Sequence, residues 1–159
     1  KNSIGIDPLL IGGGQESGWR AGTENVAAIV GFGKAAELAH LELTQRADYC
    51  LKLRKQLEQG LKTIPELSIF SEQVERLPNT VQFAIKGIDG EMLLMQLDRK
   101  NIAVSSGSAC ASGGGKASSV LLAMGIDSLL AKGAVRISLG KDNTEAEITE
   151  FIEDLGMKR

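Results

Sequence analysis

The residue best placed to do covalent chemistry in this sequence is Cys110, which lies in a stretch of very small side chains. The stretch reads SSGSACASGGG from Ser105 to Gly115 and contains no large apolar side chain and no charge. Such a segment buries too little apolar surface to offset its ordering entropy, so we expect it to be mobile and exposed. Structural cysteines are usually buried on regular elements, and Cys110 does not fit that description.

The residues alone leave the role of Cys110 open. A Gly/Ser stretch can be a passive linker that holds a cysteine by chance. The one histidine, His40, is far off in the sequence, so an activating base or cation would have to come from elsewhere in the fold. Cys50, in contrast, falls on the apolar stripe of a predicted helix, where we expect it to pack in the core.

Before residue 65 the sequence predicts a glycine-rich loop followed by two helices. The loop, Gly12 to Gly22, holds too many glycines for a helix or strand interior. Thr23 is the expected N-cap of the first helix. Apolar residues at a period near 3.6 predict a second, long amphipathic helix over residues 41–64, which Pro65 ends.

After Pro65 the pattern predicts alternating short strands and helices. Alternation, apolar runs and capping signals identify seven elements. The predicted strands are Leu67 to Phe70, Thr80 to Ile85, Ile102 to Val104 and Ala134 to Leu139, and the predicted helices are Gly90 to Lys100, Ala117 to Met124 and Thr144 to Leu155. This order predicts a small layered α/β lobe, an α+β arrangement around one core.

Composition excludes several classes of function. The chain has 159 residues and a formal net charge of −2, so a nucleic-acid partner, which requires a basic face, is not expected. No apolar run reaches the ~18 residues of a membrane helix, and Lys1 to Leu10 lacks a signal-peptide pattern. Two cysteines do not make a disulfide framework, so we expect reduced thiols and a cytoplasmic protein without a metal site.

Several segments together resemble the NifS/IscS-like cysteine desulfurases of the class V aminotransferase family. SSGSACASG is similar to the active-site loop of these enzymes, in the form of their long-loop group. GGGQESGWRAGTEN resembles their GGGQERGxRxGTxN stretch, although Ser17 stands where arginine is usual. The segments LPNT from Leu77, GEMLL from Gly90 and VRISLG from Val135 follow in the expected order, so the resemblance covers essentially the whole chain.

The resemblance implies roles for three residues. In such enzymes a protein thiolate attacks the sulfur of L-cysteine bound to pyridoxal phosphate, alanine leaves, and a persulfide remains on the protein; Cys110 matches this nucleophile. Arg136 matches the arginine that binds the substrate carboxylate, although a solvated strand face would also explain it. Thr23 matches a threonine that contacts the cofactor phosphate of the neighbouring subunit in a homodimer, and a plain helix cap would equally explain it.

The resemblance also implies which parts of the enzyme are present. We expect the C-terminal small domain of a fold-type I pyridoxal-phosphate transferase plus the tail of its large domain. The predicted division is a large-domain remnant at 1–40, a connecting helix at 41–64 and a small domain at 65–159 with the cysteine loop at 105–117. We expect residues 1–22 to be disordered or packed on another copy of the chain.

The family's cofactor lysine belongs to a segment that precedes these residues, and none of the lysines here matches it. We therefore expect the chain alone to be inactive and the intact enzyme to pass sulfur from L-cysteine to an acceptor or scaffold protein, for iron–sulfur cluster or other sulfur-cofactor assembly. Two alternatives stay open, a cofactor-free sulfur carrier or binding module and an inactive truncated remnant. Activity on selenocysteine is not determined by the sequence.

Overall fold

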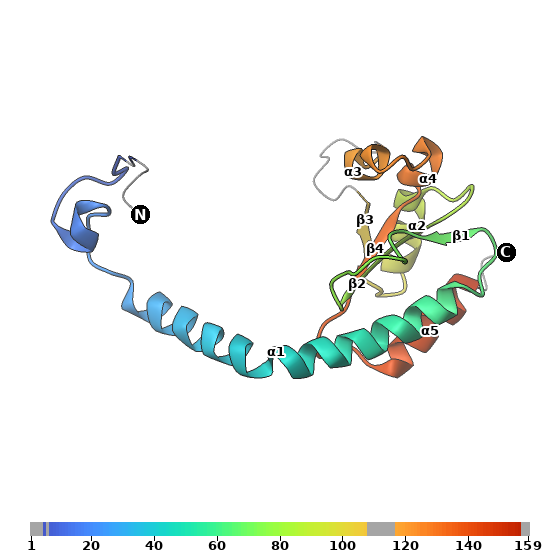
Figure 1. The fold of residues 1–159 in the computed structure, drawn as a ribbon, viewed down its shortest axis with the longest axis horizontal. Helices are drawn as coiled ribbons and strands as arrows, with labels where there is room; N and C mark the ends of the chain where they lie inside the picture. Colours follow the sequence, from blue (N-terminus) through green and yellow to red (C-terminus); the bar gives the residue numbers. More distant parts are fainter. Residues whose placement is uncertain (1–4, 6, 108–116, 157–159) are drawn as a thin grey trace. The chain divides into compact units, whose positions relative to one another are not determined.

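The computed structural model describes residue 5, residues 7–107 and residues 117–156 (Figure 1). Cys110 lies outside the described residues, so the predicted mobility of its segment stays a prediction. The chain divides into two compact units, Lys1–Leu43 and Thr44–Arg159. The three-part domain division predicted from the sequence, and the predicted disorder or packing of residues 1–22, stay predictions.

The first unit consists of a loop and the beginning of helix α1. The loop contains one 3-10 turn at Gln15–Gly18, and α1 spans Val26–Leu61. Asn25 caps this helix, since its side-chain oxygen accepts a hydrogen bond from the Ala28 N–H at 3.1 Å. The prediction that Thr23 is the N-cap is therefore wrong; the carboxamide immediately before the first turn does the capping.

Helix α1 is one continuous helix of 36 residues, where the sequence predicted two. No glycine or proline lies between Lys34 and Gly60. The backbone hydrogen bonds of the helix therefore continue without a break, even where the apolar side chains shift from one side of the helix to another. In the second unit the buried side chains of α1 recur every three or four residues; they are Cys50, Leu53, Leu57 and Leu61. The predicted core packing of Cys50 is confirmed.

The second unit is built on a four-stranded antiparallel sheet in the order β1-β2-β4-β3. The strands are β1 (Leu67–Ile69), β2 (Thr80–Ile85), β3 (Ser105–Ser106) and β4 (Val135–Ser138). Three of the four predicted strands are confirmed, and the one predicted at Ile102 to Val104 is wrong. Ile102 and Val104 instead pack against the core from the connection after α2, and pairing with β4 begins only at Ser105.

One face of this sheet carries the main hydrophobic core. Alternate residues of β2 and β4 point to it, and three helices cover it: α1, α2 (Gly90–Asp98) and α5 (Glu145–Gly156). Figure 1 shows α1 and α5 running side by side, and Gln56 of α1 donates hydrogen bonds to the Glu145 carbonyl and the Thr149 hydroxyl of α5. The period-2 pattern of the strands therefore determines which face is buried.

The opposite face of the sheet is covered only in part. A second core cluster joins Phe70, Ala84 and Ala134 to two short helices, α3 (Ser119–Ala123) and α4 (Ser128–Lys132). The sequence predicted α3 and missed α4. The capping signal for α4 was present, because Asp127 directly precedes it and accepts hydrogen bonds from the N–H groups of Leu129 and Leu130 at 2.9 and 3.2 Å.

Gly133 lies where the end of α4 approaches the chain before α2. A Cβ atom at this position would lie 2.6 Å from the carbonyl oxygen of Ile88, which belongs to the backbone and cannot turn away. We therefore expect Gly133→Ala to lower the free energy of unfolding by about 1–3 kcal/mol. Gly140→Ala is the control, since a Cβ there meets only ordinary van der Waals contact. Urea unfolding checks both variants, and equal stability of the two would contradict the close approach.

The predicted capping box at the start of α5 is confirmed. The Thr144 hydroxyl accepts from the Glu147 N–H at 3.3 Å, and the Thr144 N–H donates to the Glu147 carboxylate at 2.8 Å. This backbone donor, followed by the Asn143 side chain, holds the pKa of Glu147 below its ordinary value.

A lowered carboxyl pKa stabilises the fold above the unfolded-state value, and that stabilisation is lost as the pH falls through the folded-state pKa. We expect the wild-type chain to unfold at higher urea concentration than Glu147→Gln at pH 7. The difference should shrink below the unfolded-state glutamate pKa of about 4.3 and vanish at lower pH. Urea titrations from pH 7 to pH 3 check this, and a difference independent of pH would contradict it.

Candidate functional site

Arg136 lies at the centre of a polar row on the partly covered face of the sheet, between two half-buried neighbours. In β4 the neighbouring Val135 and Ile137 are buried while Arg136 is exposed, the orientation that the sequence predicted. The register places Gln82 of β2 on one side of Arg136 and Ser105 of β3 on the other. Sequence reasoning missed Gln82 as a neighbour, because only the strand register shows which polar residue of β2 faces Arg136.

The guanidinium of Arg136 keeps most of its donors available. Within the described part of the chain its one hydrogen bond is a long one, from Nη2 to the Ser105 hydroxyl at 3.5 Å. Among residues 5, 7–107 and 117–156, no carboxylate forms an ion pair with it. A planar cation with free donors on an open sheet face can bind a carboxylate through two parallel hydrogen bonds.

Of the two flanks of the Cys110 segment, the first contacts Ala134, two residues before Arg136, and the second packs on the core cluster to which Ala134 belongs. On the first flank, the Gly107 N–H donates to the Ala134 carbonyl at 2.8 Å. Gly107 also packs so closely that a Cβ there would lie 2.7 Å from the Cβ of Ala134. On the second flank, Ala117 packs on the cluster that contains Ala134. The structure therefore places the first end of the Cys110 segment beside the arginine row and packs the second end on the second core cluster.

Thr23 lies in the first unit, just before α1. It is exposed, and its carbonyl accepts a hydrogen bond from Arg20 Nη1 at 3.4 Å. Two of the first three N–H groups of the helix have protein partners, since Val26 donates to the Glu24 carbonyl and Ala28 to the Asn25 side chain. The helix terminus therefore gives less support for anion binding than the sequence suggested, and the role of Thr23 rests on its hydroxyl.

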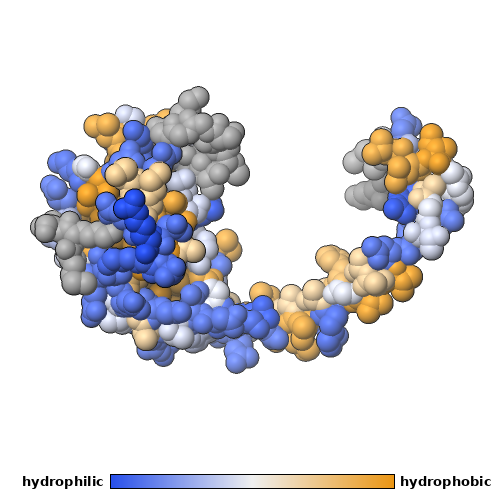
Figure 2. All heavy atoms as spheres, turned by 180° about the vertical axis from the view of Figure 1, so that it is seen from behind, coloured by the Kyte–Doolittle hydropathy of each residue, from blue (hydrophilic) through white to orange (hydrophobic). Residues whose placement is uncertain are grey.

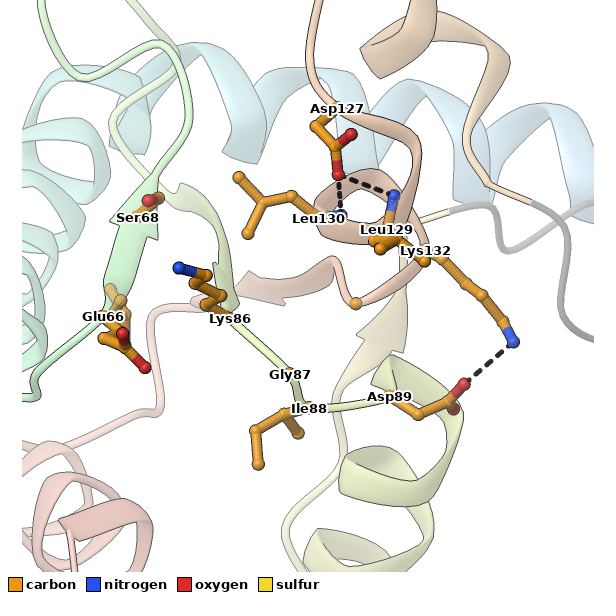
Figure 3. Close-up of a pocket in the computed structure, with 12 residues that line it drawn as sticks. Glu66, Ser68, Lys86, Gly87, Ile88, Asp89, Asp127, Leu129, Leu130 and Lys132 are labelled. Carbon is orange, nitrogen blue, oxygen red and sulfur yellow. Dashed lines mark hydrogen bonds and ion pairs between the residues drawn. The ribbon is translucent and has the colours of Figure 1, made fainter.

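A hollow of about 850 Å³ lies elsewhere in the second unit, between β1, the connection to α2 and α4 (Figure 3). Two of its three acidic side chains hold helices. Asp127 caps α4, while Asp89 caps α2 and pairs with Lys132 at 3.2 Å. The Met92 N–H, and after it Lys132, keeps the pKa of Asp89 below its ordinary range. Neither Arg136 nor Thr23 lines this hollow, so its size does not make it the reactive site.

The part of the chain that the structure describes contains neither a metal-binding cluster nor a membrane-spanning helix. No three histidine, cysteine or acidic side chains come together there in a way that could hold a metal ion. No helix among those residues has the length and apolar character needed to cross a membrane.

Pyridoxal phosphate is the cofactor that the sequence resemblance implies, and the residues present fit it only in part. The Thr23 hydroxyl makes no hydrogen bond to any residue that the structure describes, so it is available to a phosphate oxygen. The cofactor lysine of the resembled enzymes has no match in this chain. One hydroxyl among the described residues is therefore available to a phosphate, but these residues form no complete cofactor site.

Comparison with known proteins confirms the resemblance. Residues 7–151 match the family described as aminotransferase class-V. The chain is 45% identical over 154 residues to a cysteine desulfurase of Trichormus azollae, covering 96% of this chain and 38% of the relative. It is 45% identical over 158 residues to the cysteine desulfurase IscS of Clostridium botulinum (strain Hall), covering 98% of this chain and 40% of the relative.

Two solved structures confirm the fold. The NifS-like protein of Rickettsia africae superposes with a TM-score of 0.80 at 41% identity, over 96% of this chain and 39% of that one. A second NifS-like protein gives a TM-score of 0.82 at 38% identity, over 98% of this chain and 39% of that one. The chain thus has the fold of part of a NifS-like protein and spans about two-fifths of the length of the relatives it matches.

Proposed function

Because the chain belongs to the class-V aminotransferase family, we propose that it is part of a cysteine desulfurase in which Cys110 accepts the sulfur atom of L-cysteine. The observation that carries this proposal is the exposed Arg136, which has no carboxylate partner among the described residues and whose strand, β4, pairs with Ser105 and Ser106 on the N-terminal flank of the Cys110 segment. This arrangement supplies a binding group for the substrate carboxylate near the expected nucleophile.

In the proposed reaction, Arg136 binds the carboxylate of L-cysteine and orients its side chain. The Cys110 thiolate attacks the substrate sulfur, so that an S–S bond forms and the substrate C–S bond breaks. The carbon that loses sulfur takes up a proton, giving L-alanine and a persulfide on Cys110. Pyridoxal phosphate, when bound in the complete enzyme, supplies the electron sink for this cleavage.

The proposal includes the partners of the complete enzyme. The Thr23 hydroxyl contacts the cofactor phosphate held by a neighbouring copy, in a cytoplasmic homodimer. A sulfur-acceptor or scaffold protein then takes the persulfide sulfur from Cys110, for iron–sulfur cluster or other sulfur-cofactor assembly. The names of the relatives and the motifs around Cys110, Arg136 and Thr23 support these assignments.

The first test is sulfide release from L-cysteine with pyridoxal phosphate and a reductant. We expect this chain alone to release no sulfide, since the lysine that holds the cofactor has no match in it. Joined to the remaining part of the Trichormus azollae relative, it should release sulfide, and Cys110→Ser should reduce the rate to background. Turnover that survives Cys110→Ser would contradict the role of this thiol. A persulfide that forms on Cys110 without cofactor, from a persulfide donor, would favour a sulfur carrier.

The second test addresses Arg136 in the same joined enzyme. Loss of a charge-assisted hydrogen-bonded pair costs about 1.5–3 kcal/mol, so Arg136→Gln should raise KM for L-cysteine roughly 10- to 100-fold. Lys141→Gln is the control, since it removes a positive charge from an exposed position just after β4. Steady-state kinetics checks both variants, and an unchanged KM for Arg136→Gln would remove Arg136 from substrate binding.

A further inference from the structure

The row of Gln82, Arg136 and Ser105 includes one side chain to which the proposed function gives no role, that of Gln82. Gln82 is half-buried in β2, a strand that pairs with β1 on one side and with β4 on the other. Strands of the second unit therefore define its surroundings. In this it differs from the hydrophobic side chains that Figure 2 shows along the start of α1, a region that in the solved relatives belongs to a longer chain.

The hydrogen-bond pattern of the sheet brings the side chains of Gln82 and Arg136 close together. The Gln82 carbonyl accepts a hydrogen bond at 2.8 Å from the N–H of Phe70, directly after β1, so the backbone polar groups of Gln82 point away from β4. The register nevertheless places Gln82 directly opposite Arg136. In an antiparallel sheet the Cα atoms of such a non-hydrogen-bonded pair are only about 4.5 Å apart, and their side chains are closer than those of a hydrogen-bonded pair.

The carboxamide of Gln82 extends across β4 toward β3. A Cβ atom at Gly107, the residue directly after β3, would lie 3.2 Å from Gln82 Nε2. β4 lies between β2 and β3, so the side chain must cross it to come so near. It can do so because Ala134, directly before β4, carries only a methyl group on this face. The amide nitrogen of Gln82 therefore lies over the strand that carries Arg136.

The polar row presents hydrogen-bond donors without an acceptor to match them. The Gln82 carboxamide forms no hydrogen bond with any residue that the structure describes, although it is half-buried. A polar group withdrawn from water without a partner costs free energy, so a ligand that supplies an acceptor is favoured there. The guanidinium of Arg136 adds free donors beside it, and the Ser105 hydroxyl lies 3.5 Å from Arg136 Nη2.

These donors match the acceptor sites of one carboxylate. A carboxylate offers about four lone-pair sites, and the two parallel N–H groups of an arginine occupy about two of them. The Gln82 amide on one side of Arg136 and the Ser105 hydroxyl on the other can fill the remaining two. A neutral carboxamide in the same place would fit less well, because its own N–H groups would face donors.

We propose that Gln82 is a second contact for the carboxylate of L-cysteine, donating a hydrogen bond from Nε2 to the oxygen atoms that Arg136 holds. Gln82 thereby makes this end of the substrate site selective for a carboxylate over a neutral group. The proposal deepens the proposed function and rests on it for the identity of the amino acid. The contact itself rests on the strand register and on the position of the Gln82 amide.

Calorimetric titration with L-alanine, the product of the proposed reaction, tests the contact without turnover. The protein is the joined enzyme with pyridoxal phosphate and Cys110→Ser. Gln82→Met keeps the length of the side chain and removes its polar atoms. It should raise the Kd for L-alanine about tenfold or more, because a hydrogen bond to a charged group is lost. Gln73→Met is the matched control, since Gln73 is exposed in the turn after β1, and it should leave the Kd unchanged.

Titration with L-alaninamide separates a direct contact from a structural role. This ligand keeps the amino group and the methyl group of L-alanine but has no carboxylate, so Gln82→Met should leave its Kd unchanged. A distorted sheet would weaken the binding of both ligands by the same factor. An unchanged Kd for L-alanine, or an equal rise for both ligands, would overturn the proposal.

The outcome for Gln82 can be told apart from the outcome for the proposed function. If the joined enzyme with Cys110 intact releases no sulfide from L-cysteine, while Gln82→Met selectively weakens the binding of L-alanine, the carboxylate contact is supported and the proposed function is contradicted. Sulfide release that depends on Cys110, together with an affinity for L-alanine that Gln82→Met does not change, would do the reverse.

Discussion

The pairing of β4 with strands on both sides is the constraint on which the rest of the second unit depends. β4 lies between β2 and β3, so its backbone groups are used in both directions. Because side chains alternate along a strand, this one placement buries Val135 and Ile137 in the core and exposes Arg136 on the opposite face. A register shift of one residue would bury the arginine and expose the core.

Ala134, directly before β4, is also a contact point for the surrounding elements. The Ala134 carbonyl accepts a hydrogen bond from Gly107, and Ala134 packs with the cluster that holds Ala117. Gly90, at the start of α2, lies so close to this chain that a Cβ would be 3.0 Å from the Ala134 carbonyl oxygen. Glycines at two of these contacts let the backbones approach, so the first flank of the Cys110 segment and the start of α2 both lie against Ala134.

The two units differ in how much of their apolar surface is buried. The second unit has a core of its own, in which the sheet, α1, α2 and α5 enclose the large apolar side chains. The first unit has glycine-rich backbone and exposed apolar side chains, which in the solved relatives belong to a longer chain. Contacts within the second unit account for the burial of its large apolar side chains. The large apolar side chains of the first unit would be buried only by surfaces beyond the described residues.

The sequence by itself determined the elements whose signals lie among residues that are neighbours in the chain. Strict alternation predicted β2 at Thr80–Ile85, the Thr144–Glu147 pair predicted the start of α5, and the motifs around Cys110 and Arg136 predicted the family. These signals depend only on neighbours in the chain, so no tertiary contact was needed to interpret them.

Only the tertiary structure decided what depends on distant contacts. β3 forms at Ser105–Ser106 and not at the apolar Ile102 and Val104, because a strand exists only where a partner pairs with it. The row of Gln82, Arg136 and Ser105 arises in the same way, from the register of three strands. Sequence periodicity specifies which face of an element is apolar, but the neighbour that this face meets is set by packing, which periodicity does not contain.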